Sequence, residues 1–97
     1  MKLAVFVNNY DEPEILDRLK AEKFGIILVQ NGVYHATVKK NGQPSSILSR
    51  DAEFYALEED LLSRGFTAEK VDSKVKVINY DGLVDLIFND YEKFLWL

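Results

Sequence analysis

The chain has 97 residues, 47% of them hydrophobic and 29% charged, which predicts one globular domain over residues 1–97. Its net charge of −4 argues against direct binding to nucleic acid, which requires a basic surface. The sequence has no cysteine and no apolar run near the ~20 residues of a membrane helix, which excludes disulfides, thiolate metal sites and membrane-spanning helices.

The first third of the chain predicts a strand, a helix and a second strand. Residues 3–7 form a continuous apolar run, as in a strand buried on both faces of a sheet. A helix is predicted from the Asp11-Glu12-Pro13 segment, with its acidic caps and early proline, to a turn at Gly25. Residues 26–29 follow as the second buried strand. The first residues lack the layout of a secretion signal, so we expect a cytoplasmic protein.

The rest of the chain continues this alternation. Residues 33–40 predict a short helix, and residues 39–46 predict a loop around Asn41-Gly42. Gly65 suits the left-handed backbone that ends a helix. The remaining predicted elements are a helical turn at 47–50, a strand at 53–57, a helix at 58–64, a strand at 75–78 and a helix at 81–89. Strands that alternate with helices indicate βαβ units and a mainly parallel sheet.

Polar clusters follow all four predicted strands. In a parallel sheet the carboxyl ends of the strands meet at one edge, where ligands and partners bind. We therefore predict a groove for a ligand or partner at this edge. Its candidate residues are Asn8, Asn9, Tyr10, Gln30, Asn31, Gly32, Tyr34, Glu59, Asp60 and Tyr80.

The sequence offers little for catalysis. His35 is the single histidine, so it makes a poor metal site, and a helix-surface or partly packed position explains it. Glu58, Glu59 and Asp60 could act as paired carboxylates, yet favourable charge at the first turn of a helix explains them as well. The glycines form no nucleotide-binding motif. We therefore expect no catalytic residue, metal site or cofactor.

The end of the sequence is strongly apolar. The predicted helix at 81–89 carries an apolar stripe of Leu83, Val84, Ile87 and Phe88. The tail that follows it contains Phe94, Leu95, Trp96 and Leu97. A frayed tail of this kind would expose a large apolar patch to water. The tail therefore folds back as an extra strand or helix edge, or it joins a subunit interface, and both can hold.

Several short segments carry a resemblance to a known family. They are residues 27–34 (ILVQNGVY), 54–57 (FYAL), 59–61 (EDL), 64–66 (RGF), 77–80 (VINY) and 83–86 (LVDL), with a tryptophan near the end of the sequence. In this order they resemble the DsrH/TusB family of sulfur-relay subunits, within the DsrE/F-like fold. The resemblance implies a three-layer α/β/α sandwich with a small, mostly parallel sheet of four to five strands.

The resemblance also implies a cytoplasmic complex of three related small subunits. That complex relays persulfide sulfur toward 2-thiouridine at the tRNA wobble position, or it serves dissimilatory sulfur oxidation. The partners would be a DsrE/TusD-type subunit, which bears the transferring cysteine, and a DsrF/TusC-type subunit. Some members of this chain's own branch carry a cysteine near the end of the first strand. Here that stretch reads Asn8-Asn9-Tyr10-Asp11, so no nucleophile for sulfur transfer carries over.

These expectations leave more than one function open. The first is a non-catalytic subunit that holds and orients a cysteine-bearing partner. The alternative is a stand-alone homodimer that binds a small polar ligand through Asn8, Gln30, Asn31 and Tyr80. A third hypothesis, a small hydrolase, needs His35 to meet a carboxylate of residues 58–60.

Overall fold

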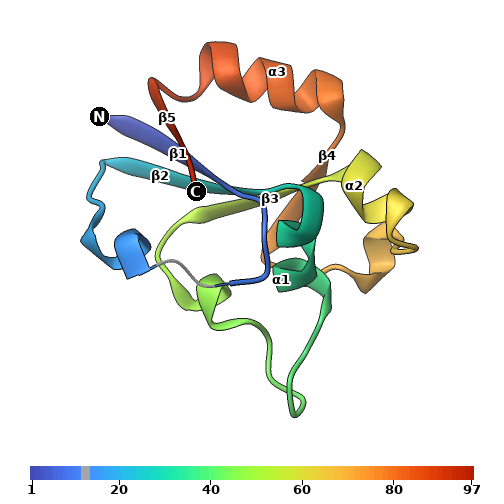
Figure 1. Ribbon diagram of the computed structural model, residues 1–97. Helices are drawn as coiled ribbons and strands as arrows, with labels where there is room; N and C mark the ends of the chain where they lie inside the picture. Colours follow the sequence, from blue (N-terminus) through green and yellow to red (C-terminus); the bar gives the residue numbers. More distant parts are fainter. Residues whose placement is uncertain (12–13) are drawn as a thin grey trace.

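A computed structural model describes residues 1–11 and 14–97, which form a five-stranded sheet with helices on both faces (Figure 1). The strands are β1 (Lys2–Val7), β2 (Lys23–Leu28), β3 (Glu53–Leu57), β4 (Val75–Ile78) and β5 (Lys93–Trp96). They lie in the order β4-β3-β2-β1-β5, and each neighbouring pair is parallel. None of the described helices is long and apolar enough to span a membrane.

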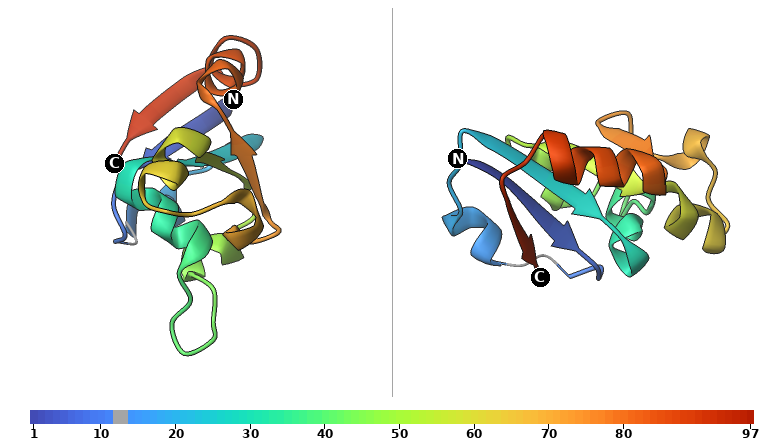
Figure 2. Two further views of the ribbon diagram at one scale, coloured as in Figure 1. Left: turned by 90° about the vertical axis from the view of Figure 1, so that its right-hand side faces the viewer. Right: turned by 90° about the horizontal axis from the view of Figure 1, so that it is seen from above.

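The helices make up the two outer layers (Figure 2). In the described residues the α-helices are α1 (Tyr34–Thr37), α2 (Glu58–Ser63) and α3 (Tyr80–Asn89). The 3-10 helices are η1 (Glu14–Arg18), η2 (Gln30–Val33), η3 (Ser46–Ser49) and η4 (Ala68–Lys70). Residues of α3 pack on one face of the sheet, and residues of η1, α1, η3 and α2 pack on the other. The predicted α/β/α sandwich with a small parallel sheet is thus confirmed.

Alternating strand positions build a separate core on each face of the sheet. On the α1 side, Val5 of β1 is buried together with Leu61 of α2. On the α3 side, Ala4 and Ile27 are buried together with Leu83. Because both faces are covered, β1 and β2 have apolar runs in place of an alternating pattern.

The four predicted strands are present, with a different start for the second. Strand β2 begins at Lys23 and ends at Leu28, whereas the sequence predicted residues 26–29. The extension follows from its ladder with β1, in which Lys23 pairs with Lys2 and Gly25 pairs with Ala4. Gly25 therefore lies inside a strand and not at the predicted turn.

The helices on the α1 side are shorter than predicted. In place of a helix from Asp11 to Gly25, the described part holds only η1, in which Leu16 alone is buried. A single buried residue gives too narrow an apolar stripe to hold a long helix on the sheet. Glu12 and Pro13, part of the predicted helix start, lie outside the described residues. The predicted helix at 33–40 is also wrong in its bounds, because η2 and α1 together end at Thr37.

Two other predicted turns are present, at Asn41-Gly42 and at Gly65. Lys40 and Gln43 form a β-bridge around a tight turn, in which Asn41 and Gly42 have φ angles of 53° and 77°. Gly65 takes the predicted left-handed backbone after α2, with φ at 81°.

Helix α3 and the tail complete the α3 side. The apolar stripe predicted for this helix is half wrong, because Val84 and Phe88 are 47% and 79% exposed. Leu83 and Ile87 of the predicted stripe do pack against the core, together with Leu86. The tail folds back as β5 alongside β1, which confirms the extra strand. Its part in a subunit interface stays a prediction.

Candidate functional site

A cleft of about 370 Å³, here called the strand-end cleft, opens between α3 and β5. Three residues predicted for the groove line it, Gln30, Asp60 and Tyr80, and so does Trp96, predicted for the subunit interface. Its other lining residues are Phe6, Val29, Leu57, Leu83 and Ile87. Apolar walls with a few polar groups at the ends of parallel strands are typical of a site for a ligand or a partner side chain.

Gln30 stands at this cleft in an uncommon backbone conformation. Its φ of 50° lies in the left-handed region, which residues other than glycine rarely adopt. The Gln30 N–H donates a 2.7 Å hydrogen bond to Asp60 Oδ2. Strained backbone persists where its surroundings hold it, and such residues cluster at functional sites. The bond to Asp60 supplies one such contact.

Arg64 joins η2 to α2 beside the cleft. Its Nε and Nη2 donate to Asn31 Oδ1 at 3.1 and 2.9 Å, and its Nη1 donates to the Asp60 carbonyl at 3.1 Å. Glu59 Oε2 accepts a hydrogen bond from the Tyr80 N–H at 3.3 Å. Asn31, Glu59 and Asp60 thus hold together the segments that follow three strands. These hydrogen bonds tie the strand ends to one another.

Gly32 permits the close approach of η2 to β1. A Cβ at this position would overlap the carbonyl oxygen of Val7, which accepts a 3.0 Å hydrogen bond from the Val29 N–H. Asn8 directly follows that carbonyl and is partly buried. The glycine therefore allows the ends of β1 and β2 to meet in the predicted edge.

The other predicted groove residues lie on the α1 side of the sheet, apart from the strand-end cleft. The rings of Tyr10 and Tyr34 meet edge to face, with centroids 6.2 Å apart. Asn9 Oδ1 accepts a 3.1 Å hydrogen bond from the Asp11 N–H, which closes a turn after β1. The structure therefore divides the single predicted groove between the two faces of the sheet.

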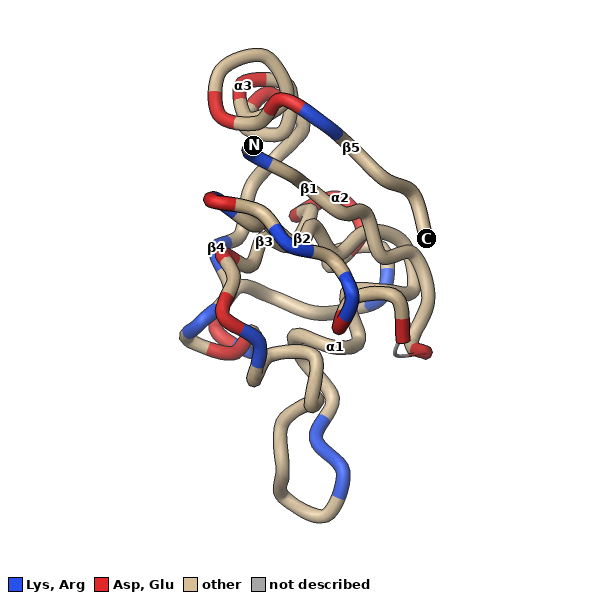
Figure 3. The backbone as a smooth tube through the Cα atoms, turned by 90° about the vertical axis from the view of Figure 1, so that its left-hand side faces the viewer, with Lys and Arg blue, Asp and Glu red and all other residues tan. Residues whose placement is uncertain are grey.

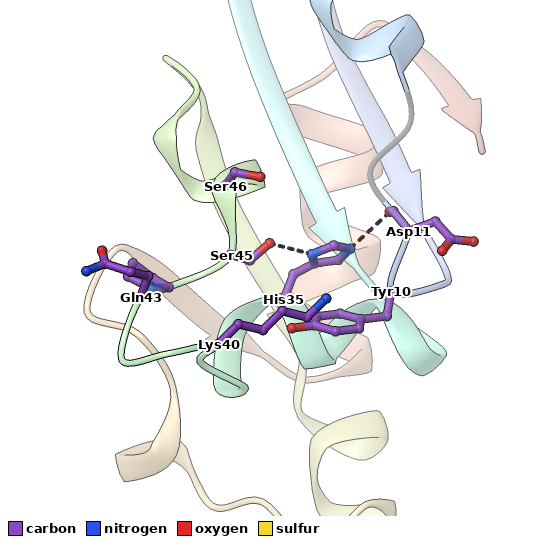
Figure 4. Close-up of a pocket in the computed structure, with 8 residues that line it drawn as sticks. Tyr10, Asp11, His35, Lys40, Gln43, Ser45 and Ser46 are labelled. Atoms are coloured by element: carbon purple, nitrogen blue, oxygen red, sulfur yellow. Dashed lines mark hydrogen bonds between the residues drawn. The ribbon is translucent and has the colours of Figure 1, made fainter.

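Tyr10 belongs to a second cavity of about 400 Å³, the loop pocket (Figure 4). Its lining residues are Tyr10, Asp11, His35, Lys40, Gln43, Pro44, Ser45 and Ser46. The sequence pointed to this region through Tyr10, predicted as a groove residue, and through the loop at 39–46, but not to a separate pocket. It gave no reason to expect that the turn would bring Lys40 to 5.0 Å from the centroid of the Tyr10 ring.

His35 is buried at 3% exposure, so the predicted surface or partly packed position is wrong. Its Nε2 lies 3.1 Å from the carbonyl oxygens of both Asn9 and Asp11, and its Nδ1 lies 2.6 Å from Ser45 Oγ. Because carbonyl oxygens only accept, Nε2 carries a hydrogen and donates it to them. Nδ1 and the Ser45 hydroxyl share a further hydrogen bond. These bonds join two loops. None of these three bonds is to the carboxylates of residues 58–60 that the hydrolase hypothesis requires.

The opposite end of the sheet holds a cluster that the sequence analysis missed. Glu53 Oε2 accepts hydrogen bonds from the hydroxyls of Tyr91 and Tyr55 at 2.9 and 3.0 Å, and Lys23 Nζ lies 3.8 Å away. Burial acts to raise the pKa of Glu53, but the two hydroxyl bonds and the nearby lysines outweigh it and lower that pKa. Burial, with the bonds to Tyr55 and Glu53, raises the pKa of Tyr91. Tyr91 thus stays neutral and anchors the chain before β5.

The tail keeps three of its four predicted interface residues at the surface. Phe94, Leu95 and Trp96 are 37%, 37% and 65% exposed. Phe6 packs against both aromatic rings, with centroids 6.3 Å from Phe94 and 4.7 Å from Trp96. Leu97 differs, because it packs against the core on the α1 side.

Sequence comparisons relate the chain to one family. The profile of a family described as "DsrH like protein" matches residues 11–93. Protein TusB of Photorhabdus laumondii is 34% identical over 82 residues, which cover 84% of each chain. Protein TusB of Buchnera aphidicola is 35% identical over 71 residues, which cover 73% of each chain.

Solved structures give the same picture. Tm0979 from Thermotoga maritima is 32% identical with a TM-score of 0.62, over 91% of this chain and 93% of that one. Another structure of Tm0979, described as a candidate sulfur transferase, is 34% identical with a TM-score of 0.57. The match covers 93% of this chain and 95% of that one. MTH1491 from Methanobacterium thermoautotrophicum, of unknown function, has a TM-score of 0.71 over 99% of this chain and 98% of that one. At 14% identity it supports the fold alone.

Proposed function

Since the chain belongs to the DsrH/TusB family, we propose that it is a non-catalytic subunit of a sulfur-relay complex. The complex would pass persulfide sulfur toward 2-thiouridine at the tRNA wobble position, the pathway favoured by the relatives called Protein TusB. Dissimilatory sulfur oxidation is the other pathway in which such a subunit would serve. In either case the chain would act in the cytoplasm as a single domain.

One observation carries the non-catalytic role. A persulfide relay needs a cysteine sulfur, and this family member has no cysteine in its sequence. The polar residues at the strand ends are joined to one another, as in the bonds of Arg64 to Asn31 and of Gln30 to Asp60. Such a network favours a rigid surface that holds and orients a cysteine-bearing partner of the DsrE/TusD type, beside a DsrF/TusC-type subunit.

The test supplies the purified chain and the purified sister subunits, separately and mixed, with a cysteine desulfurase and radiolabelled cysteine. The expected result is label on the cysteine-bearing sister and none bound covalently to this chain. The mixture should also contain a stable complex by native mass spectrometry. Covalent label on this chain alone would show that the scaffold role is wrong.

The loop pocket favours binding of a small polar ligand, the second candidate function, through residues other than the predicted Asn8, Gln30, Asn31 and Tyr80. Lys40 supplies a cation to this pocket, and Ser45 and Tyr10 supply hydroxyl groups. A stable homodimer whose melting temperature rises with small polar metabolites would favour this function. Absence of cysteine-bearing sister proteins from the same cells would favour it too.

A further inference from the structure

Helix α3 exposes an apolar stripe that the core does not use. Tyr80, Val84 and Phe88 are 59%, 47% and 79% exposed. They stand four residues apart, so they share one side of the helix, while Leu83 and Leu86 face the sheet. An isolated surface leucine needs no explanation, but a row of apolar side chains marks a surface that binds something.

This stripe continues across the sheet to the edge strand. Phe6 of β1 pairs with Trp96 of β5, and Phe94 stands two residues before Trp96 on the same face, which α3 covers only in part (Figure 2). The strand-end cleft connects the two sets, because Tyr80 lines one of its walls and Trp96 another. We call the six residues together the docking face: Phe6, Tyr80, Val84, Phe88, Phe94 and Trp96.

The composition of the docking face is that of a protein interface. Five of its six residues are aromatic, and aromatic side chains are enriched in the residues that carry binding energy between proteins. The cleft in its middle has room for a bulky apolar side chain of a partner.

The negative charges on α3 indicate what kind of partner binds the docking face. Helix α3 carries Asp81 and Asp85 and has no lysine or arginine. In Figure 3 its turns are tan and red. If two copies packed through α3, carboxylates would meet carboxylates with no cation of either helix between them. Juxtaposed like charges disfavour a pairing and act against wrong partners. A partner with lysine or arginine opposite Asp81 and Asp85 would instead match in charge.

We propose that the docking face binds a protein subunit of different sequence, which presents basic side chains to Asp81 and Asp85 and an apolar side chain to the strand-end cleft. This inference rests on the proposed function, because the subunit is one of the sister proteins of the relay. It favours a complex of unlike chains over a homodimer through α3.

The experiment measures assembly of the purified chain with the two purified sister subunits by sedimentation velocity and native mass spectrometry. Phe88→Ser should weaken assembly at least tenfold, and Asp85→Lys should weaken it most at low salt, where charge attraction is least screened. Matched controls are Leu62→Ser on α2, where Leu62 is 58% exposed, and Asp51→Lys in an exposed loop. Both controls should assemble like the unmodified chain. A thermal melt of each variant checks that it is folded.

The outcomes separate the two proposals. Assembly of Phe88→Ser and Asp85→Lys at the unmodified level would overturn the docking face and leave the relay function standing. A dimer of the unmodified chain alone that Phe88→Ser dissolves would identify a second copy as the occupant and also overturn it. If the unmodified chain failed to assemble with either sister, both proposals would fall. Because Asp85→Lys leaves the apolar residues intact, it remains decisive if Phe88→Ser does not fold.

Discussion

Gly32 shows how the absence of one side chain positions a whole edge of the molecule. Its helical neighbourhood alone would favour alanine, which is better than glycine by about 1 kcal/mol inside helices. The carbonyl oxygen of Val7, however, occupies the space of the missing Cβ. Since backbone cannot move aside as a flexible side chain can, the steric effect should outweigh the propensity.

Gly32→Ala should therefore lower the free energy of unfolding by about 1–3 kcal/mol, the usual cost of forcing atoms into a packed site. Urea unfolding followed by tryptophan fluorescence or circular dichroism measures the change. Gly82→Ala is the comparison, because the nearest atom to its Cβ is the Ile78 Cβ at 3.3 Å, and its effect should be smaller. An unchanged or raised midpoint for Gly32→Ala would contradict the close approach of η2 to β1.

Glu53 gives a second prediction at this scale, on pH. Its pKa is lowered in the folded protein from an ordinary value of 4.5. A lowered pKa means that the ionised form stabilises the fold above about pH 4.5, and that this contribution is lost as the pH falls through the folded pKa. Glu53→Gln should therefore flatten the loss of stability on acidification below pH 4.5. Thermal melts between pH 3 and pH 7 test it, and an equally steep loss in the variant would refute it.

At the scale of elements, α3 depends on the residue that precedes it. The Asn79 side chain accepts a 2.9 Å hydrogen bond from the Gly82 N–H, which caps the first turn. Asn79→Ala should cost about 0.5–2 kcal/mol, the range measured for lost caps. Asn79→Asp keeps an oxygen acceptor and should cost much less. Equal losses in the two variants, measured by urea unfolding, would mean that the cap bond contributes nothing.

The elements also show what a sequence can and cannot predict. The strands were predictable because residues 3–5 and 54–57 are buried in successive positions, and such apolar runs are visible without knowledge of neighbours. The prediction placed Phe88 in the buried stripe of α3 and left out Leu86. Both side chains are apolar, and only the packing decides which of them faces the sheet. The start of β2 at Lys23 depends on its ladder with β1, which no local pattern encodes.

The candidate site was predictable only in its outline. The polar residues do follow the strand ends, but the segments after the strands turn to different faces of the sheet. Tyr10 lies in the bend after β1 and Tyr80 begins α3, so they line different cavities. The contact of Glu53 with Tyr91 joins residues 38 positions apart, and neither position is unusual in the sequence. Contacts of this kind arise from the tertiary fold, so reading along the chain misses them.

At the scale of the whole molecule, the tail is both part of the sheet and part of its surface. Trp96→Ala combined with Phe94→Ala should change the free energy of unfolding by no more than about 1 kcal/mol, because exposed positions contribute little to stability. The same variant should assemble poorly with the sister subunits in sedimentation velocity. Leu86→Ala, which empties a buried position, should cost about 2–5 kcal/mol and serves as the contrast. An unfolded double variant would mean that the tail belongs to the core.

The pairing of β5 with β1 sets an order of events during synthesis. Leu3 pairs with Lys93, so the outer rung of the sheet joins residues 90 positions apart. Contacts of such long range form slowly, since a long loop must close before they are made. Until residues 93–96 leave the ribosome, the hydrogen-bonding edge of β1 stays bare, and bare strand edges pair with other chains. The nascent chain therefore passes through a stage when β1 is open to neighbours, and any sister subunit or chaperone that acts early would meet it there.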